Sequence, residues 1–192
     1  MLNDLAHCPG LMVDWRLMQH VVAVESSFNP HAIGVVGTPL SRQPTRLEEA
    51  VELAGQLRRQ GRNYSLGLAQ VNVHNLAAQG LHSHEKAFEP CPNVVAGSRI
   101  LAACHQRYGS WEKALSCYYA GNAQTGFEHG YVQKVVKRVL EHIAGTRPSV
   151  DDLPPVSGAV QRRRLLPTQT TTAGPGTTRV DDATATDISR VF

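Results

Sequence analysis

Apolar residues recur with helical spacing through most of the first three quarters of the chain. The clearest case closes this region, where one stripe contains Val132, Val135, Val136, Val139, Leu140 and Ile143. Steps of three and four residues place these side chains on one face of an α-helix. No segment shows a convincing strand-like alternation of apolar and polar residues. The pattern therefore predicts a mainly α-helical domain over residues 1–145.

A capping pattern predicts another helix in the middle of this domain. Thr45 is followed three residues later by Glu48, which is the order of side chains in a capping box. Apolar residues then recur with helical spacing, and Gly61 is a typical helix stop. We therefore expect a helix over about 46–60.

Two adjacent helices are expected in the second half of the domain. Asn93 is a candidate N-cap, and Gly109 marks the end of the helix that it would begin. Residues 111–119 then have the spacing of a short partner helix. Together these segments predict a helical hairpin that turns at Gly109.

The four cysteines bear on that hairpin. No two of them have the C-x-x-C spacing of a zinc site, which favours disulfides. In a straight helix over 93–108, Cys104 lies roughly 16 Å from the helix start, whereas a disulfide needs Cα atoms within about 7 Å, so Cys91 should not pair with it. We favour Cys104 with Cys117 and Cys8 with Cys91. Cys8 with Cys104 and Cys91 with Cys117 stays open, as does a fully reduced chain.

Composition changes sharply near Gly145. All nine histidines and every aromatic residue except Phe192 lie before it. The stretch 146–192 is rich in Pro, Thr, Gly and Asp, and such a segment buries too little apolar surface to offset its ordering entropy. We therefore expect one domain over 1–145 and a disordered tail over 146–192.

Charge and hydropathy exclude two classes of partner. The net charge is +3, and the cluster of Arg162 to Arg164 is too small for a nucleic-acid footprint. Asp14 and Arg16 interrupt the most apolar stretch, so no segment supplies the roughly 20 apolar residues of a membrane span. These interruptions, and the lack of Lys or Arg in residues 1–10, do not fit a secretory signal peptide. We expect no nucleic-acid partner and no membrane span.

A carboxylate interrupts the apolar stripe of the first predicted helix. Steps of four and three residues connect Leu11, Trp15, Met18, Val22 and Glu25, before a helix end near Asn29 and Pro30. Desolvation raises the pKa of a carboxyl group, so Glu25 on this stripe would stay protonated near neutral pH, as a general acid must. The alternative is that Glu25 lies at the helix end and turns to water.

Two further segments place polar groups beside small residues. Residues 65–72 predict a turn whose small residues allow close backbone approach, followed by amides that can hydrogen-bond a polar ligand. Residues 117–122 place two tyrosines before a glycine that ends a helix. Each segment alone is weak evidence, because ordinary turns and core aromatics have the same composition.

Taken together, these segments resemble the three motifs of lysozyme-like lytic transglycosylases. The matching stretches are Glu25-Ser26, Gly67-Leu68-Ala69-Gln70 and Tyr118-Tyr119-Ala120-Gly121-Asn122. From about Cys8 to His142 the chain is similar to the VirB1-like branch associated with type IV secretion and conjugation, including Asn29 to Gly37 and Phe88 to Cys91. The resemblance implies a lysozyme-like helical domain of the goose-type or soluble lytic transglycosylase kind, with no metal and no cofactor.

The resemblance also implies the roles of individual residues. Glu25 would be the catalytic acid, and the substrate-binding residues would be Ser26, Gly67, Gln70, Asn72, Tyr118 and Tyr119. Glycoside cleavage usually employs two carboxyl groups, and no other carboxylate here is an obvious second catalyst. We therefore expect a single-acid mechanism, which the substrate's own acetamido group and 6-hydroxyl complete.

The implied function is cleavage of the MurNAc–GlcNAc β-1,4 bond of peptidoglycan with a 1,6-anhydromuramoyl product, opening the cell wall for assembly of a type IV secretion system. The implied partners are peptidoglycan glycan strands and components of that system, and the implied location is the periplasm. Two other functions stay open: a lysozyme-type hydrolase of the same fold, and a secretion-machine adaptor that binds glycan without cutting it.

Some features do not follow the family pattern. Tyr119 stands where the family has Asn after the motif tyrosine. Residues 34–63 form an insertion relative to the shortest members, whose helix would wall the groove or face a partner. His74, His82 and His84 suggest zinc instead, but His-x-His in a polar loop is a poor ligand set without a third neighbour of known position.

Overall fold

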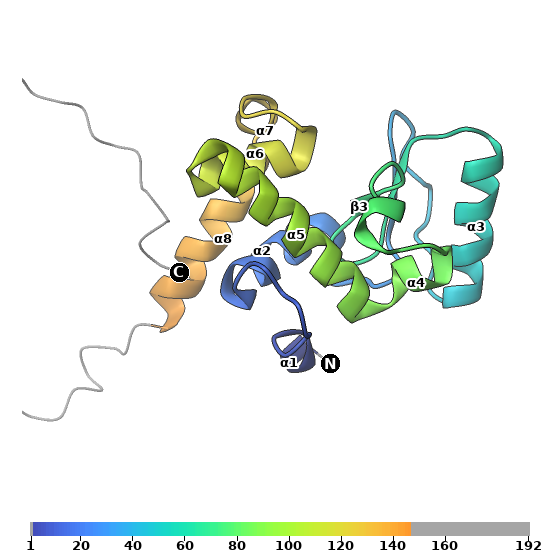
Figure 1. Ribbon diagram of the computed structural model, residues 1–192, viewed down its shortest axis with the longest axis horizontal. Helices are drawn as coiled ribbons and strands as arrows, with labels where there is room; N and C mark the ends of the chain where they lie inside the picture. The colour runs from blue at the N-terminus through green and yellow to red at the C-terminus, as the bar shows by residue number, and fades with distance from the viewer. Residues whose placement is uncertain (1, 147–192) are drawn as a thin grey trace, which may run out of the picture.

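The computed structural model describes residues 2–146 and is drawn in Figure 1. Its helices are α1 (Leu2–Leu5), α2 (Trp15–Ser26), α3 (Leu47–Arg59), α4 (His84–Phe88), α5 (Pro90–Tyr108), α6 (Trp111–Ala120), α7 (Thr125–Glu128) and α8 (Tyr131–Thr146). The remaining elements are β1 (Ile33–Val35), β2 (Tyr64–Leu66), β3 (Val71–Asn72) and the 3-10 helix η1 (Ala77–Gln79). The prediction of a mainly helical domain is confirmed, and the structure also contains short strands that the sequence pattern did not reveal. The tail expected to be disordered lies, from residue 147 on, outside the described residues.

Helix α5 contributes to two hydrophobic cores. The first packs α2, α6 and α8 against α5 and includes the fully buried Leu17 and Leu115. The second lies between α3, the strands and α4 and includes the fully buried Tyr64 and Leu66. In Figure 1, α5 crosses the molecule from α4 to α6 and so connects the two cores.

The three strands form one antiparallel sheet in the order β1-β2-β3. They are two or three residues long, which is too short for an alternating pattern to stand out in the sequence. At the outer edge of β1, the Ile33 N–H donates to Oε1 of Gln43 at 2.8 Å, and Nε2 of Gln43 donates to the Ile33 carbonyl at 3.0 Å. The Gln43 carboxamide thus occupies part of the edge that another strand would pair with.

Both predicted side-chain caps are wrong. Arg46 is the N-cap of α3 and makes no capping bond, while the carboxylate of Glu49 accepts a hydrogen bond from the Thr45 N–H at 3.1 Å. Helix α5 begins at Pro90, because the fixed φ and missing N–H of proline suit the first helical turn. Asn93 therefore lies inside α5, where it is fully buried.

Helix α8 buries most of its predicted apolar stripe. Val132, Val135 and Val139 are buried, whereas Leu140 is 42% exposed, so the buried face is narrower than the sequence pattern suggests. The helix packs against both α2 and α6. No helix within residues 2–146 combines the length and the apolar character that crossing a bilayer requires.

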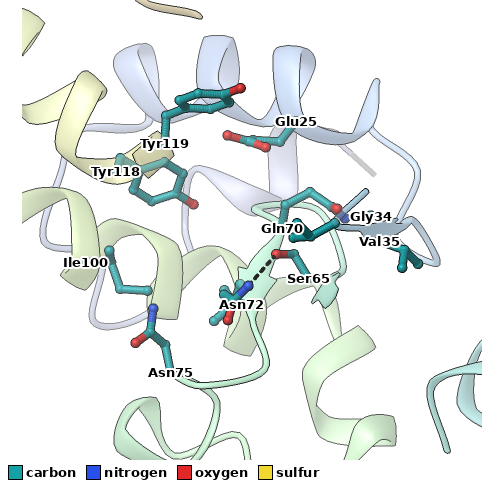
Figure 2. Close-up of a pocket in the computed structure, with 12 residues that line it drawn as sticks. Glu25, Gly34, Val35, Ser65, Gln70, Asn72, Asn75, Ile100, Tyr118 and Tyr119 are labelled. Atoms are coloured by element: carbon teal, nitrogen blue, oxygen red, sulfur yellow. Dashed lines mark hydrogen bonds between the residues drawn. The ribbon is translucent and has the colours of Figure 1, made fainter. Parts of the chain in front are cut away.

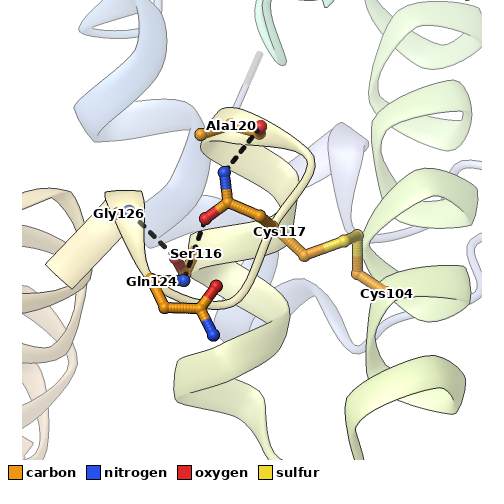
Figure 3. Close-up of a disulfide and its surroundings, with 7 residues drawn as sticks. Cys104, Ser116, Cys117, Ala120, Gln124 and Gly126 are labelled. Carbon is orange, nitrogen blue, oxygen red and sulfur yellow. Dashed lines mark hydrogen bonds between the residues drawn. A yellow bond between two sulfur atoms is a disulfide. The ribbon is translucent and has the colours of Figure 1, made fainter.

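Two disulfides confirm the favoured cysteine pairing. Cys8 bonds to Cys91 and Cys104 bonds to Cys117, with Cα–Cα distances of 5.3 and 5.8 Å. Figure 3 shows that the second disulfide joins α5 to α6, on the opposite side of α6 from the contact with α7. Cys91 and Cys104 both lie in α5, which explains why they cannot pair with each other.

Candidate active site

Helix α2 ends beside a cavity. The C-cap Ser27 has a φ of 50°, so the helix ends at Ser26, before the predicted end near Asn29. Glu25, in the last turn, points into a cavity of about 270 Å³ (Figure 2). The residues that line the cavity come from α2, the sheet and the segment after it, α5 and α6: Glu25, Gly34, Val35, Val36, Ser65, Gln70, Val71, Asn72, Asn75, Ile100, Tyr118 and Tyr119.

The carboxyl group of Glu25 borders the cavity but is largely desolvated. The residue as a whole is only half-buried because part of it faces the cavity, but burial of the carboxyl raises its pKa from 4.5 to about 7. A hydrogen bond from Tyr131 partly opposes that rise. Near neutral pH a large fraction of Glu25 is therefore protonated, as proton donation requires.

Tyr131 is the group that sequence reasoning missed. It opens α8 and is 5% exposed, and its Oη donates to Oε1 of Glu25 at 2.6 Å. The sequence does carry one signal, since Tyr131 immediately precedes the apolar stripe that begins at Val132. A tyrosine at a buried position needs a partner for its hydroxyl, but no local pattern identifies Glu25 as that partner.

Two tyrosines of α6 face the cavity in different ways. Oη of Tyr118 donates to the carbonyl of Ala69 at 2.5 Å. The ring of Tyr119 stacks on that of Tyr131, with centroids 4.8 Å apart, and its hydroxyl lies 3.2 Å from Nδ1 of His129. Burial, and then the Glu25 carboxyl, raise the pKa of both Tyr118 and Tyr131 well above the ordinary value, so both remain hydrogen-bond donors.

The turn over residues 67–70 brings Gln70 to the cavity wall. Nε2 of Gln70 donates to the carbonyls of Ala32 and Gly67 at 3.0 and 2.8 Å. A Cβ at Gly34 would lie 2.6 Å from Oε1 of Gln70, so glycine makes room there for the carboxamide. The Gln70 side chain is thus fixed between β1 and the turn.

Backbone strain concentrates around this cavity. The described non-glycine residues with positive φ are Ser27, Phe28 and Gln70, at 50°, 63° and 47°. Such conformations cost of order 1–3 kcal/mol each and persist where surrounding contacts impose them. Two of these residues closely follow Glu25, and the third lines the cavity.

The structure brings together most of the predicted site residues. Glu25, Gln70, Asn72, Tyr118 and Tyr119 line the cavity. The predicted residues Ser26 and Gly67 do not line it: the Ser26 hydroxyl donates to the Val22 carbonyl at 3.1 Å, and Gly67 forms the turn behind Gln70. The insertion contributes Gly34, Val35 and Val36 to the wall, but its helix α3 does not reach the cavity.

Glu25 is the one carboxylic acid among the cavity-lining residues that the structure describes. In that same part of the chain, no three His, Cys, Asp or Glu side chains are grouped to hold a metal ion. Of the three histidines considered for zinc, His84 instead places Nε2 2.9 Å from the hydroxyl of Tyr64. The cavity therefore offers one proton donor, several amides and two phenols.

Comparisons with known proteins agree with this arrangement. Residues 10–140 match the family model described as the transglycosylase SLT domain. The chain is 47% identical over 135 residues to "Type IV secretion system protein virB1" of Brucella suis biovar 1 (strain 1330), covering 63% of this chain and 56% of the relative. It is 31% identical over 128 residues to "Protein virB1" of Rhizobium radiobacter, covering 60% and 51%. The chain spans about half the length of the curated relatives that it matches. No solved structure matches it.

Proposed function

The chain belongs to the transglycosylase SLT domain family, and we propose that it is a lytic transglycosylase that cleaves the MurNAc–GlcNAc β-1,4 bond of peptidoglycan. The observation that carries this proposal is the desolvated Glu25 carboxyl at the cavity wall, whose pKa of about 7 suits an acid that donates and then recovers a proton near neutral pH. A helix end, a strained turn and two tyrosines surround that group, as the family resemblance implies.

The absence of a second carboxyl from the described cavity wall favours a single-acid mechanism. The Glu25 carboxyl donates its proton to the glycosidic oxygen as the bond from that oxygen to C1 of MurNAc breaks. The oxygen of the substrate's acetamido group stabilises the positive charge that develops at C1. The Glu25 carboxylate then takes the proton of the 6-hydroxyl as that oxygen bonds to C1. The product is a 1,6-anhydromuramoyl end, Glu25 is again protonated, and no water is consumed.

We assign supporting roles to the residues around Glu25. Tyr131 orients the acid through its hydrogen bond of 2.6 Å. Gln70 and Asn72 offer their carboxamide oxygens to the sugar or its acetamido substituent, because their N–H groups already donate within the protein. Tyr119 offers its stacked aromatic ring. Ser26 and Gly67 do not line the cavity but support its wall. Ser26 is the last residue of α2, and Gly67 forms part of the 67–70 turn.

The names of the relatives suggest the setting. Proteins named for virB1 and for type IV secretion are 31% and 47% identical to this chain over the matched residues. We therefore propose that the chain opens peptidoglycan locally during assembly of such a secretion system, in the periplasm, with glycan strands and components of the system as partners. Residues 10–140, which match the family model, include every residue of the cavity wall.

Release of soluble muropeptides from purified sacculi tests the activity. We expect the wild-type chain to release them and Glu25→Gln to release none while remaining folded, because the amide keeps the shape but cannot donate the proton. Glu48→Gln is the matched control, since Glu48 is an exposed glutamate of α3 away from the cavity. Sacculus binding without release by the wild type would support a glycan-binding adaptor instead.

A further inference from the structure

Asn93 makes three hydrogen bonds inside the protein. It is fully buried near the start of α5. Its Oδ1 accepts from the N–H of Ala69 at 2.7 Å, and its Nδ2 donates to the carbonyls of Leu66 and Ala87 at 2.9 and 2.8 Å. A buried carboxamide whose two N–H groups and oxygen all have partners is held in one orientation.

These bonds enclose the 67–70 turn. Leu66 and Ala69 stand on either side of Gly67, which has a φ of 76° and whose Cβ, if present, would lie 2.5 Å from Nδ2 of Asn93. One helical turn along α5, a Cβ at Gly97 would lie 2.5 Å from the Cβ of Ala69. Helix α5 therefore presents an amide and a glycine, four residues apart, to the same turn.

The 67–70 turn also fixes two groups at the cavity. The N–H of Ala69 is bonded to Asn93, and its carbonyl accepts the hydroxyl of Tyr118 at 2.5 Å. The next residue is Gln70, which holds a φ of 47° and lines the cavity. Asn93 itself does not line the cavity, so its influence on the site passes through the turn.

We propose that Asn93 is a positioning residue of the active site, whose carboxamide clamps the 67–70 turn and thereby sets the places of Gln70 and Tyr118. Its kinetic consequence rests on the proposed transglycosylase function, but the clamp itself is measurable without turnover. The sequence predicts Asn93 as a helix cap, whereas the structure buries its carboxamide against the 67–70 turn.

Two variants and one control isolate the clamp. Asn93→Ala removes all three bonds, and Asn93→Asp keeps the shape and the acceptor for Ala69 but loses the donors. Ser98→Ala is the matched control, because Ser98 is also fully buried in α5 and its hydroxyl accepts from the Met12 N–H at 3.1 Å, away from the turn. Each variant is assayed well below its own unfolding temperature.

The kinetic test compares kcat with KM on soluble glycan strands. We expect Asn93→Ala to lower kcat about tenfold to a hundredfold, since small displacements of positioning groups have effects of that size. KM should change less than kcat, and the pH at which kcat/KM falls through ionisation of Glu25 should not move. Ser98→Ala should keep the wild-type kcat. In combination with Gln70→Ala, the loss should be less than additive. A wild-type kcat in Asn93→Ala, or full additivity, would overturn the proposal.

Hydrogen exchange of the Gln70 side-chain amide, followed by NMR, tests the clamp independently. The amide is held by the carbonyls of Ala32 and Gly67, so we expect slow exchange in the wild type and in Ser98→Ala. Exchange should be faster in Asn93→Ala, or in Asn93→Asp if the alanine variant does not fold. Fast exchange in the wild type, or equal exchange in all variants, would overturn the clamp. Absence of wild-type turnover with these exchange results would refute the proposed function alone.

Discussion

The hydroxyl of Tyr131 donates a hydrogen bond of 2.6 Å to Oε1 of Glu25, between residues 106 positions apart in the chain. Glu25 lies in the last turn of α2, and Tyr131 opens α8, which packs against α2. Burial raises the pKa of Glu25, and the hydrogen bond from the Tyr131 hydroxyl lowers it in part. The packing of these two helices therefore sets the pH range in which the acid is protonated.

The first prediction concerns Tyr131→Phe. Loss of the hydroxyl removes a bond that lowers the pKa of Glu25, so that pKa should rise further. An acid donates only while protonated, so the fall of kcat/KM at high pH should move to higher pH. Tyr119→Phe is the control, because the Tyr119 hydroxyl contacts His129 rather than Glu25. An unchanged pH dependence of kcat/KM in Tyr131→Phe, or an equal shift in both variants, would contradict this account.

The second prediction concerns stability in Glu25→Gln. The pKa of Glu25 is about 7 in the folded chain against 4.5 ordinarily, so between these pH values the folded state binds more protons than the unfolded state. The uptake of this proton therefore stabilises the folded state fully below about pH 4.5, and the stabilisation is lost as the pH rises to about 7. The loss amounts to roughly 3 kcal/mol of the free energy of unfolding.

Chemical unfolding across this pH range measures the effect as the free energy of unfolding of the wild type minus that of Glu25→Gln. We expect this difference to fall as pH rises. His20 acts in the opposite direction, because burial and then the neighbouring charges of His142 and Arg138 lower its pKa to about 4. Since His20 is present in both proteins, its contribution cancels. A difference that does not vary with pH would refute the buried acid.

Local sequence signals predicted part of the site and part of the fold. Glu25 stands out because a carboxylate interrupts an apolar stripe, and the length of a helix over 93–108 excludes a disulfide between Cys91 and Cys104. The sequence predicts that Gly61, Gly109 and Gly121 end helices, and each has a positive φ just beyond its helix. These features depend on residues close together in the chain.

Contacts between distant residues could not be predicted in this way. The partner of the Tyr131 hydroxyl depends on how α8 packs on α2, which no local pattern specifies. Asn93 resembled an N-cap because capping and burial favour the same short amide side chain, and only the approach of the 67–70 turn distinguishes the two. The strands are too short to show an alternation.

The third prediction compares two helical glycines. A Cβ at Gly97 would lie 2.5 Å from the Cβ of Ala69 and 2.9 Å from Oη of Tyr118, so Gly97→Ala should lower the free energy of unfolding by about 1–3 kcal/mol and also reduce activity. Gly55→Ala in α3 would approach only the end of the Arg59 side chain, at 3.5 Å, and should stabilise by about 0.5–1 kcal/mol. Chemical unfolding measures both, and changes of the same sign would contradict the crowding at Gly97.

The fourth prediction ranks the two disulfides. Cys8 and Cys91 are 83 residues apart, whereas Cys104 and Cys117 are 13 apart. In the chain-entropy description, the longer loop loses more freedom in the unfolded state, which gives about 4.5 kcal/mol for the first bond and about 3 kcal/mol for the second. Double alanine variants of each pair, compared by chemical unfolding, should follow this order. The reverse order would show that native contacts outweigh loop entropy.

The fifth prediction addresses the central claim, that Glu25 donates the proton in a reaction that consumes no water. The most direct measurement is mass spectrometry of the muropeptides released from sacculi in water enriched in heavy oxygen. We predict unlabelled 1,6-anhydromuramoyl ends, lighter by one water than reducing ends, and no product from Glu25→Gln. Labelled reducing ends as the main product, or undiminished release by Glu25→Gln, would contradict the account.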